Sequence, residues 1–168
     1  DILLVNDGSW DDTSKKAQDL CVSVIDLPFN LGIGGAMQTG YIYASRNGYD
    51  YAVQVDGDGQ HEPGCIAELM KPVTEGLADM AIGSRYIMKS SYRSSPLRRM
   101  GMLFFSYMVG LLTGESLKDT TSGFRAVNRK VMDYFAASYP TDYPEVDVLI
   151  KLHRKNFRIM ELPVKMHE

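Results

Sequence analysis

The chain has 168 residues, of which 45% are hydrophobic, so it is long enough to bury the core of one domain. Its formal net charge is −3 and its basic residues are dispersed, which argues against a dedicated nucleic-acid-binding protein. No signal peptide is visible, and no run reaches the roughly 18 consecutive apolar residues that a membrane-spanning helix needs. Cys21 and Cys65 form no metal-ligand pattern, and we expect both to be buried thiols in a reducing compartment.

Strand-like and helix-like patterns alternate along the chain, which predicts an α/β fold with a largely parallel sheet. In the first half, the patterns predict strands at 2–5, 22–27 and 51–55 and helices at 13–20, 36–46 and 63–73. In the second half, they predict strands at 80–82, 122–127 and 157–162 and helices at 97–113, 128–135 and 145–154. We expect the strand at 51–55 to be the central one, and residues 1–168 to be a single domain cut at both ends.

An apolar run at 100–112 follows three arginines, Arg93, Arg98 and Arg99. A basic segment that leads into an apolar helix can lie at a membrane surface. A helix buried in the core of the domain is the alternative, and the sequence leaves both open.

The most informative stretch is 50–60, where a strand pattern leads directly into two carboxylates, Asp56 and Asp58. Side chains at i and i+2 of a strand share a face, so the two can converge on one point. Gly57 removes bulk between them, and Gly59 allows a sharp turn just after. Proteins hold Mg²⁺ or Mn²⁺ with one or two carboxylates, water and substrate phosphates. The stretch therefore predicts metal-assisted transfer from a nucleotide diphosphate.

Other interpretations of this stretch fit less well. A calcium-binding EF-hand loop needs glycine at position six and glutamate at position twelve, where this chain has His61 and Ala67. In phosphatases of the haloacid dehalogenase type, Thr or Val usually follows the motif, which opens the domain. Here Gln60 follows, and an α/β unit precedes. A polar turn without chemistry remains an alternative, since Asp and Gly both favour turns.

Three predicted strands end in polar, glycine-rich segments at 6–9, 56–60 and 83–85, which we expect to meet in one cleft. Asp7 is a candidate for contacting a nucleotide, or it caps a turn or helix. Gly34 and Gly35 precede a predicted helix, whose first N–H groups could bind phosphate, although close helix–strand packing is an equal alternative. Arg85 could clamp a diphosphate through two hydrogen bonds or form a surface ion pair.

Two further segments carry candidate groups. The stretch 119–125 combines Asp119, hydroxyls, a glycine and Arg125, and it could line an acceptor site or form a turn into a strand. Glu145 and Asp147 begin a predicted helix, where acidic residues also favour the helix dipole. The histidines are too scattered for a catalytic triad or a zinc site, and only His61 adjoins the predicted chemistry.

Together these motifs resemble the family 2 glycosyltransferases with the GT-A-type fold, and most closely their dolichol- and polyprenol-phosphate branch. The matching segments follow one another in the family's order, at 6–13, 30–40, 56–61, 83–85, 119–125 and 161–164. The resemblance implies an inverting transfer of a sugar from a UDP- or GDP-linked donor. The implied acceptor is polyprenyl phosphate, with a glycan or polysaccharide as the alternative. The implied location is cytoplasmic, peripheral to the inner face of the membrane.

The resemblance also implies roles for particular residues. Asp7 would contact the nucleotide, and Arg85 and Arg125 would contact phosphates of donor or acceptor. In the segment 56–61, the side chains of Asp56, Asp58 and Gln60 would bind Mg²⁺ or Mn²⁺.

The need for a general base depends on the acceptor. A lipid phosphate is already anionic and needs little help from a base, whereas a sugar hydroxyl needs one. Asp119 and Glu145 are the candidates for that base, and Asp58 is counted with them among the catalytic residues.

The chain also departs from the family pattern, because it lacks the opening strand with Pro-x-Tyr-Asn-Glu that helps to form the nucleotide pocket. A non-catalytic module that binds nucleotide sugars or lipids therefore remains an alternative. A nucleotidyltransferase is a third possibility, although residues 6–13 do not resemble its glycine-rich loop.

Overall fold

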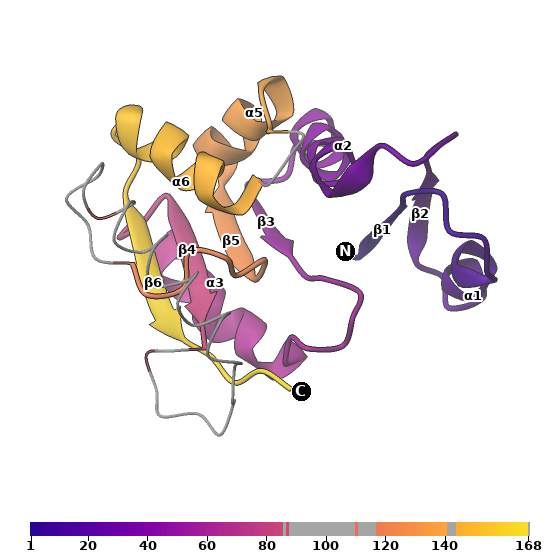
Figure 1. The fold of residues 1–168 in the computed structure, drawn as a ribbon, viewed down its shortest axis with the longest axis horizontal. Helices are drawn as coiled ribbons and strands as arrows, with labels where there is room; N and C mark the ends of the chain where they lie inside the picture. The colour runs from indigo at the N-terminus through magenta and orange to yellow at the C-terminus, as the bar shows by residue number, and fades with distance from the viewer. Residues whose placement is uncertain (86, 88–109, 111–116, 141–143, 168) are drawn as a thin grey trace.

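The computed structural model describes residues 1–85, 87, 110, 117–140 and 144–167 (Figure 1). The helix expected at 97–113, which includes the apolar run at 100–112, lies outside the described residues apart from position 110. Within the described ranges, no helix is both long enough and apolar enough to cross a membrane.

In the part of the chain that the structure describes, the larger sheet has four strands in the order β3-β5-β4-β6. These strands are β3 (Tyr51–Gln54), β4 (Met80–Ser84), β5 (Arg125–Asn128) and β6 (Ile159–Pro163). β6 pairs with β4 in parallel, whereas β5 runs antiparallel to both β3 and β4. β3, β4 and β6 therefore share one direction, as expected of a mostly parallel sheet.

Two expectations about this sheet were wrong. β3 lies at the edge of the four-stranded sheet and not at its centre, because among the described strands only β5, from later in the chain, pairs with it. β5 also begins at Arg125 and not at residue 122, so the residues before it form a loop. The antiparallel direction of β5 was not predicted either, because a short antiparallel strand has the same alternation of side chains as a parallel one.

A second, two-stranded sheet pairs β1 (Leu3–Asn6) with β2 (Ser23–Asp26) in parallel, connected by the helix α1 (Thr13–Asp19). The helix α2 (Gly32–Arg46) follows and contacts β1, β3 and the later helix α5. α2 thus connects the small sheet to the large one, as Figure 1 shows.

Helices cover both faces of the large sheet, which gives three layers (Figure 1). α5 (Arg129–Ala137) and α6 (Pro144–Arg154) pack on one face, and α3 (Ile66–Thr74) packs on the other. The alternation along β4 follows this arrangement, because Met80 and Ile82 belong to the cluster with α5 and α6, whereas Ala81 belongs to the cluster with α3.

The start of α2 differs from expectation, because the helix begins at Gly32 and not at residue 36. Side chains of residues that precede the helix satisfy N–H groups at its start. The carboxylate of Asp7 accepts a hydrogen bond from the N–H of Leu31 at 2.6 Å, and Asn30 accepts one from Gly32 at 3.0 Å. These bonds stabilise an earlier helix start than the glycines alone would favour.

The expectation of two buried thiols was wrong as well. Cys21 is exposed and has a φ of 57°, in the turn that ends α1, while Cys65 is half-buried. The apolar residues next to Cys21 suggested a buried position, but the chain reverses direction there before β2 begins.

The strand directions bring four loops to one edge of the large sheet. β3, β4 and β6 end at this edge, and the antiparallel β5 begins there. Residues 55–61, Arg85, residues 117–124 and residues 164–167 therefore adjoin one another, where ligands of open α/β sheets usually bind.

Candidate active site

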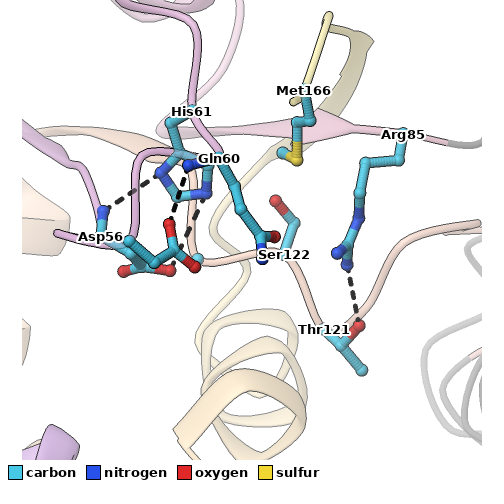
Figure 2. A pocket seen from close by; sticks show the side chains of 9 residues that line it. Asp56, Gln60, His61, Arg85, Thr121, Ser122 and Met166 are labelled. Atoms are coloured by element: carbon cyan, nitrogen blue, oxygen red, sulfur yellow. Dashed lines mark hydrogen bonds and ion pairs between the residues drawn. The ribbon is translucent and has the colours of Figure 1, made fainter. Parts of the chain in front are cut away.

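A cavity of about 360 Å³ opens at this edge (Figure 2). Its lining comes from all four loops: Asp56, Asp58, Gln60, His61, Arg85, Thr121, Ser122, Gly123 and Met166. Figure 2 shows Asp56 and His61 on one side of the cavity and Arg85 on the other. The site thus sets two carboxylates opposite a guanidinium group.

Asp56 is held from two directions. Its backbone N–H donates to Nδ1 of His61 at 3.1 Å, and Gln54 Nε2 donates to its Oδ1 at 3.2 Å. His61 is itself buried, and its ring stacks on Phe124 with centroids 4.8 Å apart. Since Nδ1 accepts a hydrogen bond, a neutral His61 carries its proton on Nε2, which lies 3.8 Å from the Asp56 carboxylate. The sequence pointed to His61 as the last residue of the matching segment 56–61 but assigned it no role.

Asp58 and Gln60 stand on the turn that follows Asp56. Asp58 Oδ1 accepts a hydrogen bond from the Gln60 N–H at 3.0 Å, and Gly59 takes a φ of 75°, which a side chain would strain. The cavity therefore presents oxygen atoms of two carboxylates and one amide. Among the described residues, no group of three or more His, Cys, Asp or Glu side chains could hold a metal ion.

Arg85 and Asp119 form an ion pair in which both side chains are buried. Nε of Arg85 lies 2.9 Å from Oδ2 of Asp119, and Nη2 lies 3.1 Å from Oδ1. The Arg85 backbone N–H also donates to Oδ2, at 3.2 Å, and Nη2 reaches Thr121 at 3.4 Å. The Asp119 side chain has no exposed surface, and Asp119 is not among the cavity-lining residues. The carboxylate thus orients Arg85 toward the cavity.

Glu161 of β6 anchors the loop that carries Asp119. Its two carboxylate oxygens accept hydrogen bonds from the backbone N–H groups of Lys118, at 2.8 Å, and Asp119, at 2.6 Å. This contact was not predicted, although residues 161–164 formed one of the matching motifs. Asp119 is therefore fixed through its main chain by Glu161 and through its side chain by Arg85.

Arg125 is buried behind the same loop and is only 2% exposed. Its Nε donates to the carbonyl oxygen of Ser122 at 2.8 Å, and its Nη2 lies 3.5 Å from that of Thr120. Arg125 does not belong to the residues that line the cavity. Its hydrogen bonds shape the loop, whereas the sequence had suggested a direct contact with phosphate.

The C-terminal segment closes the remaining side of the cavity. The backbone N–H of His167 donates to the carbonyl oxygen of Gln60 at 2.8 Å, and Met166 pairs with His61 in an isolated β-bridge. The side chain of His167 lies 2.7 Å from Glu62, and this bond holds the pKa of Glu62 below its usual value. No sequence pattern had marked Met166 as a lining residue.

Asp7, Gly34 and Gly35 are not among the described residues that line the cavity. Asp7 binds the start of α2, where Gly34 is buried and a side chain at Gly35 would collide with Leu31. Glu145 is in the first turn of α6, and its side chain lies outside the description. The roles suggested for these residues stay predictions.

Comparison with known sequences identifies the family. The chain matches the family model of glycosyl transferase family 2 over residues 1–135, and it therefore belongs to this family. The resemblance drawn from the six ordered motifs is confirmed.

Two relatives show how far the similarity extends. A polyprenol monophosphomannose synthase from Mycolicibacterium smegmatis is 32% identical over 177 residues, which cover 99% of this chain and 66% of that protein. An undecaprenyl-phosphate mannosyltransferase from Micrococcus luteus is 31% identical over 182 residues, which cover 100% of this chain and 72% of that protein. The chain thus spans about two thirds of the first relative's length.

A solved structure shows the same fold. Glucosyl-3-phosphoglycerate synthase from Mycobacterium tuberculosis, in a complex with Mn²⁺, UDP-glucose and phosphoglyceric acid, superposes with a TM-score of 0.71 at 18% identity. The match covers 99% of this chain and 60% of that one. The expected GT-A-type α/β fold is confirmed.

Proposed function

We propose that this protein is a metal-dependent, inverting glycosyltransferase that moves a sugar from a nucleoside diphosphate to polyprenyl phosphate. The observation that carries the proposal is the cavity in which Asp56 and Asp58 face the buried, oriented Arg85. The two relatives described above are named as a polyprenol monophosphomannose synthase and an undecaprenyl-phosphate mannosyltransferase. The structural neighbour was crystallised with Mn²⁺ and a UDP-sugar.

The residues present fit a hard divalent cation, Mg²⁺ or Mn²⁺. Asp56, Asp58 and Gln60 offer only oxygen ligands from their side chains, and two carboxylates suffice when substrate phosphates and water complete the coordination. A bound cation would offset the negative charge that develops on the departing nucleoside diphosphate. Asp58, the more exposed of the two carboxylates, is the residue we expect to contribute most directly to this site.

Arg85 provides the positive group of the cavity. A guanidinium matches phosphate geometry through paired hydrogen bonds, and it gains precision when a carboxylate fixes its orientation. We therefore assign Arg85 to a phosphate of donor or acceptor and Asp119 to the orientation of Arg85. Arg125 supports the loop between them and acts on the phosphate only through that loop.

The lining residues favour an acceptor that is already anionic. Among the residues that the structure describes, Asp56 and Asp58 are the only carboxylates that line this cavity, and both are assigned to the cation. His61 is stacked and hydrogen-bonded beneath Asp56, so it is badly placed to take a proton from an acceptor. A lipid phosphate needs no such base, whereas a sugar hydroxyl would require one, for which Glu145 remains the candidate. The reaction would then take place at the cytoplasmic face of a membrane.

The nucleoside is assigned to the smaller sheet. Asp7 follows the end of β1 and is bound to the start of α2, the helix whose first turn contains Gly34 and Gly35. This placement supports a contact between Asp7 and the base or ribose.

The direct test incubates the full-length protein with radiolabelled UDP- and GDP-sugars and polyprenyl phosphate, with and without Mn²⁺ or Mg²⁺. We expect label to enter the organic phase only with metal, and an Asp58→Ala variant to lose this transfer. Label that instead appears on an added glycan would support the glycan-elongating alternative. Metal-dependent donor binding without any product would identify a binding module and contradict the proposal.

A further inference from the structure

We propose that Gly123 is a positioning residue for the candidate metal site, because its missing side chain makes the space that the Asp56 carboxylate occupies. The inference rests on the proposed function, in which Asp56 is a metal ligand. It extends that function to Gly123, which lies in the loop before β5 and is far from Asp56 and Asp58 in sequence.

The distances leave no room for a side chain at this position. A Cβ atom on Gly123 would lie 2.9 Å from both Cγ and Oδ1 of Asp56, and closer still to Oδ2. Carbon and oxygen atoms that are not hydrogen-bonded cannot approach so closely without repulsion. Either the loop or the carboxylate would have to move.

The requirement for glycine is spatial and not conformational. Five glycines of the described chain have a positive φ, and Gly123 is not one of them. An alanine could therefore adopt the same backbone conformation without strain. The effect of a substitution at Gly123 should come from the contact with Asp56.

The loop is held in place, so the carboxylate is the part that must give way. Arg125 binds the carbonyl oxygens of Thr120 and Ser122, and Glu161 binds the N–H groups of Lys118 and Asp119. By contrast, the Asp56 carboxylate is the terminal group of a side chain that can rotate about its bonds.

Rotation would move the Asp56 carboxylate out of its position but would change the stability of the fold little. The carboxylate accepts a hydrogen bond from Gln54 Nε2 and lies 3.8 Å from Nε2 of His61, and both contacts depend on its present orientation. An alanine at Gly123 would push it away from these partners and change where a cation could bind. Loss of metal affinity without loss of stability is therefore the signature of this role.

The experiment titrates Mn²⁺ alone into the full-length protein by calorimetry and records thermal unfolding without metal. We expect Gly123→Ala to weaken Mn²⁺ binding by about 10–100-fold, the range typical of residues that orient metal ligands. Its melting temperature should stay close to that of the wild type. Gly40→Ala is the matched control, since the nearest atom to its added Cβ is Val5 Cγ2 at 3.8 Å.

A second glycine serves as the opposite control. A Cβ on Gly83 would lie 2.8 Å from side-chain atoms of both Phe124 and Val164, inside the core. Gly83→Ala should therefore lower the melting temperature, because overpacking strains a filled core. If Gly123→Ala resembled Gly83→Ala in stability, its role would be structural and our inference would be overturned.

A double-mutant cycle separates this inference from the proposed function. In an Asp56→Ala background, Gly123→Ala should cause no further loss of Mn²⁺ affinity, because no carboxylate is left to displace. If Mn²⁺ binding depends on Asp58 but is unchanged in Gly123→Ala, the inference fails and the proposed function stands. If the wild type binds no Mn²⁺, the metal site itself is wrong, and the inference falls with it.

Discussion

Asp119 and Arg85 are both almost fully buried, and of the two only Arg85 lines the cavity. The sequence made Asp119 a candidate general base, because a carboxylate in a polar loop is available in principle for proton transfer. Its two oxygens are instead directed at the guanidinium and the backbone N–H of Arg85. A carboxylate in this position serves best by fixing the direction of the arginine.

Replacement of Asp119 distinguishes these roles. We expect Asp119→Asn to destabilise the fold by about 3 kcal/mol, because breaking a buried ion pair leaves an uncompensated charge. Urea unfolding measures the free energy, and the KM for the anionic substrate should rise as well, since Arg85 loses its support.

The matched comparison is the double variant Arg85→Gln/Asp119→Asn, which should be less destabilised than the sum of the two single variants. A large fall in kcat with stability and KM unchanged would point back to a general base.

β6 contributes to the site without touching the cavity. Glu161, on this strand, binds the N–H groups of Lys118 and Asp119, so the strand fixes the loop that orients Arg85. An unbroken path of contacts thus runs from the sheet to the cavity. The sheet serves as a rigid support, which is what a precise binding site needs.

Glu161→Gln should loosen this loop. The amide oxygen can still accept one hydrogen bond, but the amide NH₂ group would face the second N–H, and the charge is lost. We expect destabilisation of roughly 1–3 kcal/mol, as for other hydrogen bonds to charged groups. Hydrogen exchange at Lys118 and Asp119 should become faster, and unchanged exchange at both amides would refute the anchoring role.

Asp79, just before β4, connects neighbouring strands at the end of the sheet away from the cavity. Its carboxylate accepts hydrogen bonds from Asn128, at the end of β5, and from the backbone N–H of Arg158, before β6, both at 2.9 Å. Burial alone would raise the pKa of Asp79, but the bonds from Arg158 and Asn128 outweigh burial and lower it. The ionised carboxylate therefore stabilises the folded state.

This shift sets the sign of a pH dependence. Because the pKa of Asp79 is lowered on folding, its contribution is fully present above the unfolded value of about 3.9 and is lost as pH falls through the folded pKa. We expect Asp79→Asn to cost about 2 kcal/mol at pH 7 and progressively less below about pH 4.

Urea unfolding of the wild type and the variant across this pH range measures the difference. Asp50→Asn, at an exposed position, is the control and should have little effect at any pH. A penalty for Asp79→Asn that stays constant into acid would show that the carboxylate charge is not the cause. Mn²⁺ affinity should be unchanged, because Asp79 lies at the edge away from the cavity.

Across the whole molecule, the sequence predicted what depends on local pattern. The alternation of strands and helices gave the α/β class, and the spacing of Asp56, Asp58 and Gln60 placed three lining residues correctly. Arg85 was also placed, because polar residues after a buried strand gather at the same edge of a sheet.

Features that depend on distant partners could not be predicted. The antiparallel direction of β5 brings the loop before it to the site, and nothing in four residues encodes that direction. Likewise, Arg125 belongs to the same motif as Asp119 but is buried behind the loop, because β5 lies between β3 and β4 and Arg125 pairs with both Gln54 and Ile82. Asp7 satisfies the start of α2 for the same reason, since its hydrogen bond with the N–H of Leu31 joins residues 24 positions apart in sequence.

The most direct test of the account is the affinity of the full-length protein for UDP and GDP, measured by calorimetry with and without Mn²⁺. If Asp56, Asp58 and Arg85 form a metal–diphosphate site, one nucleotide should bind at least about tenfold, or about 1.4 kcal/mol, more tightly with Mn²⁺. Asp58→Ala should remove this gain while leaving the metal-free affinity unchanged. Equal affinity with and without metal, or a gain that survives Asp58→Ala, would contradict the account.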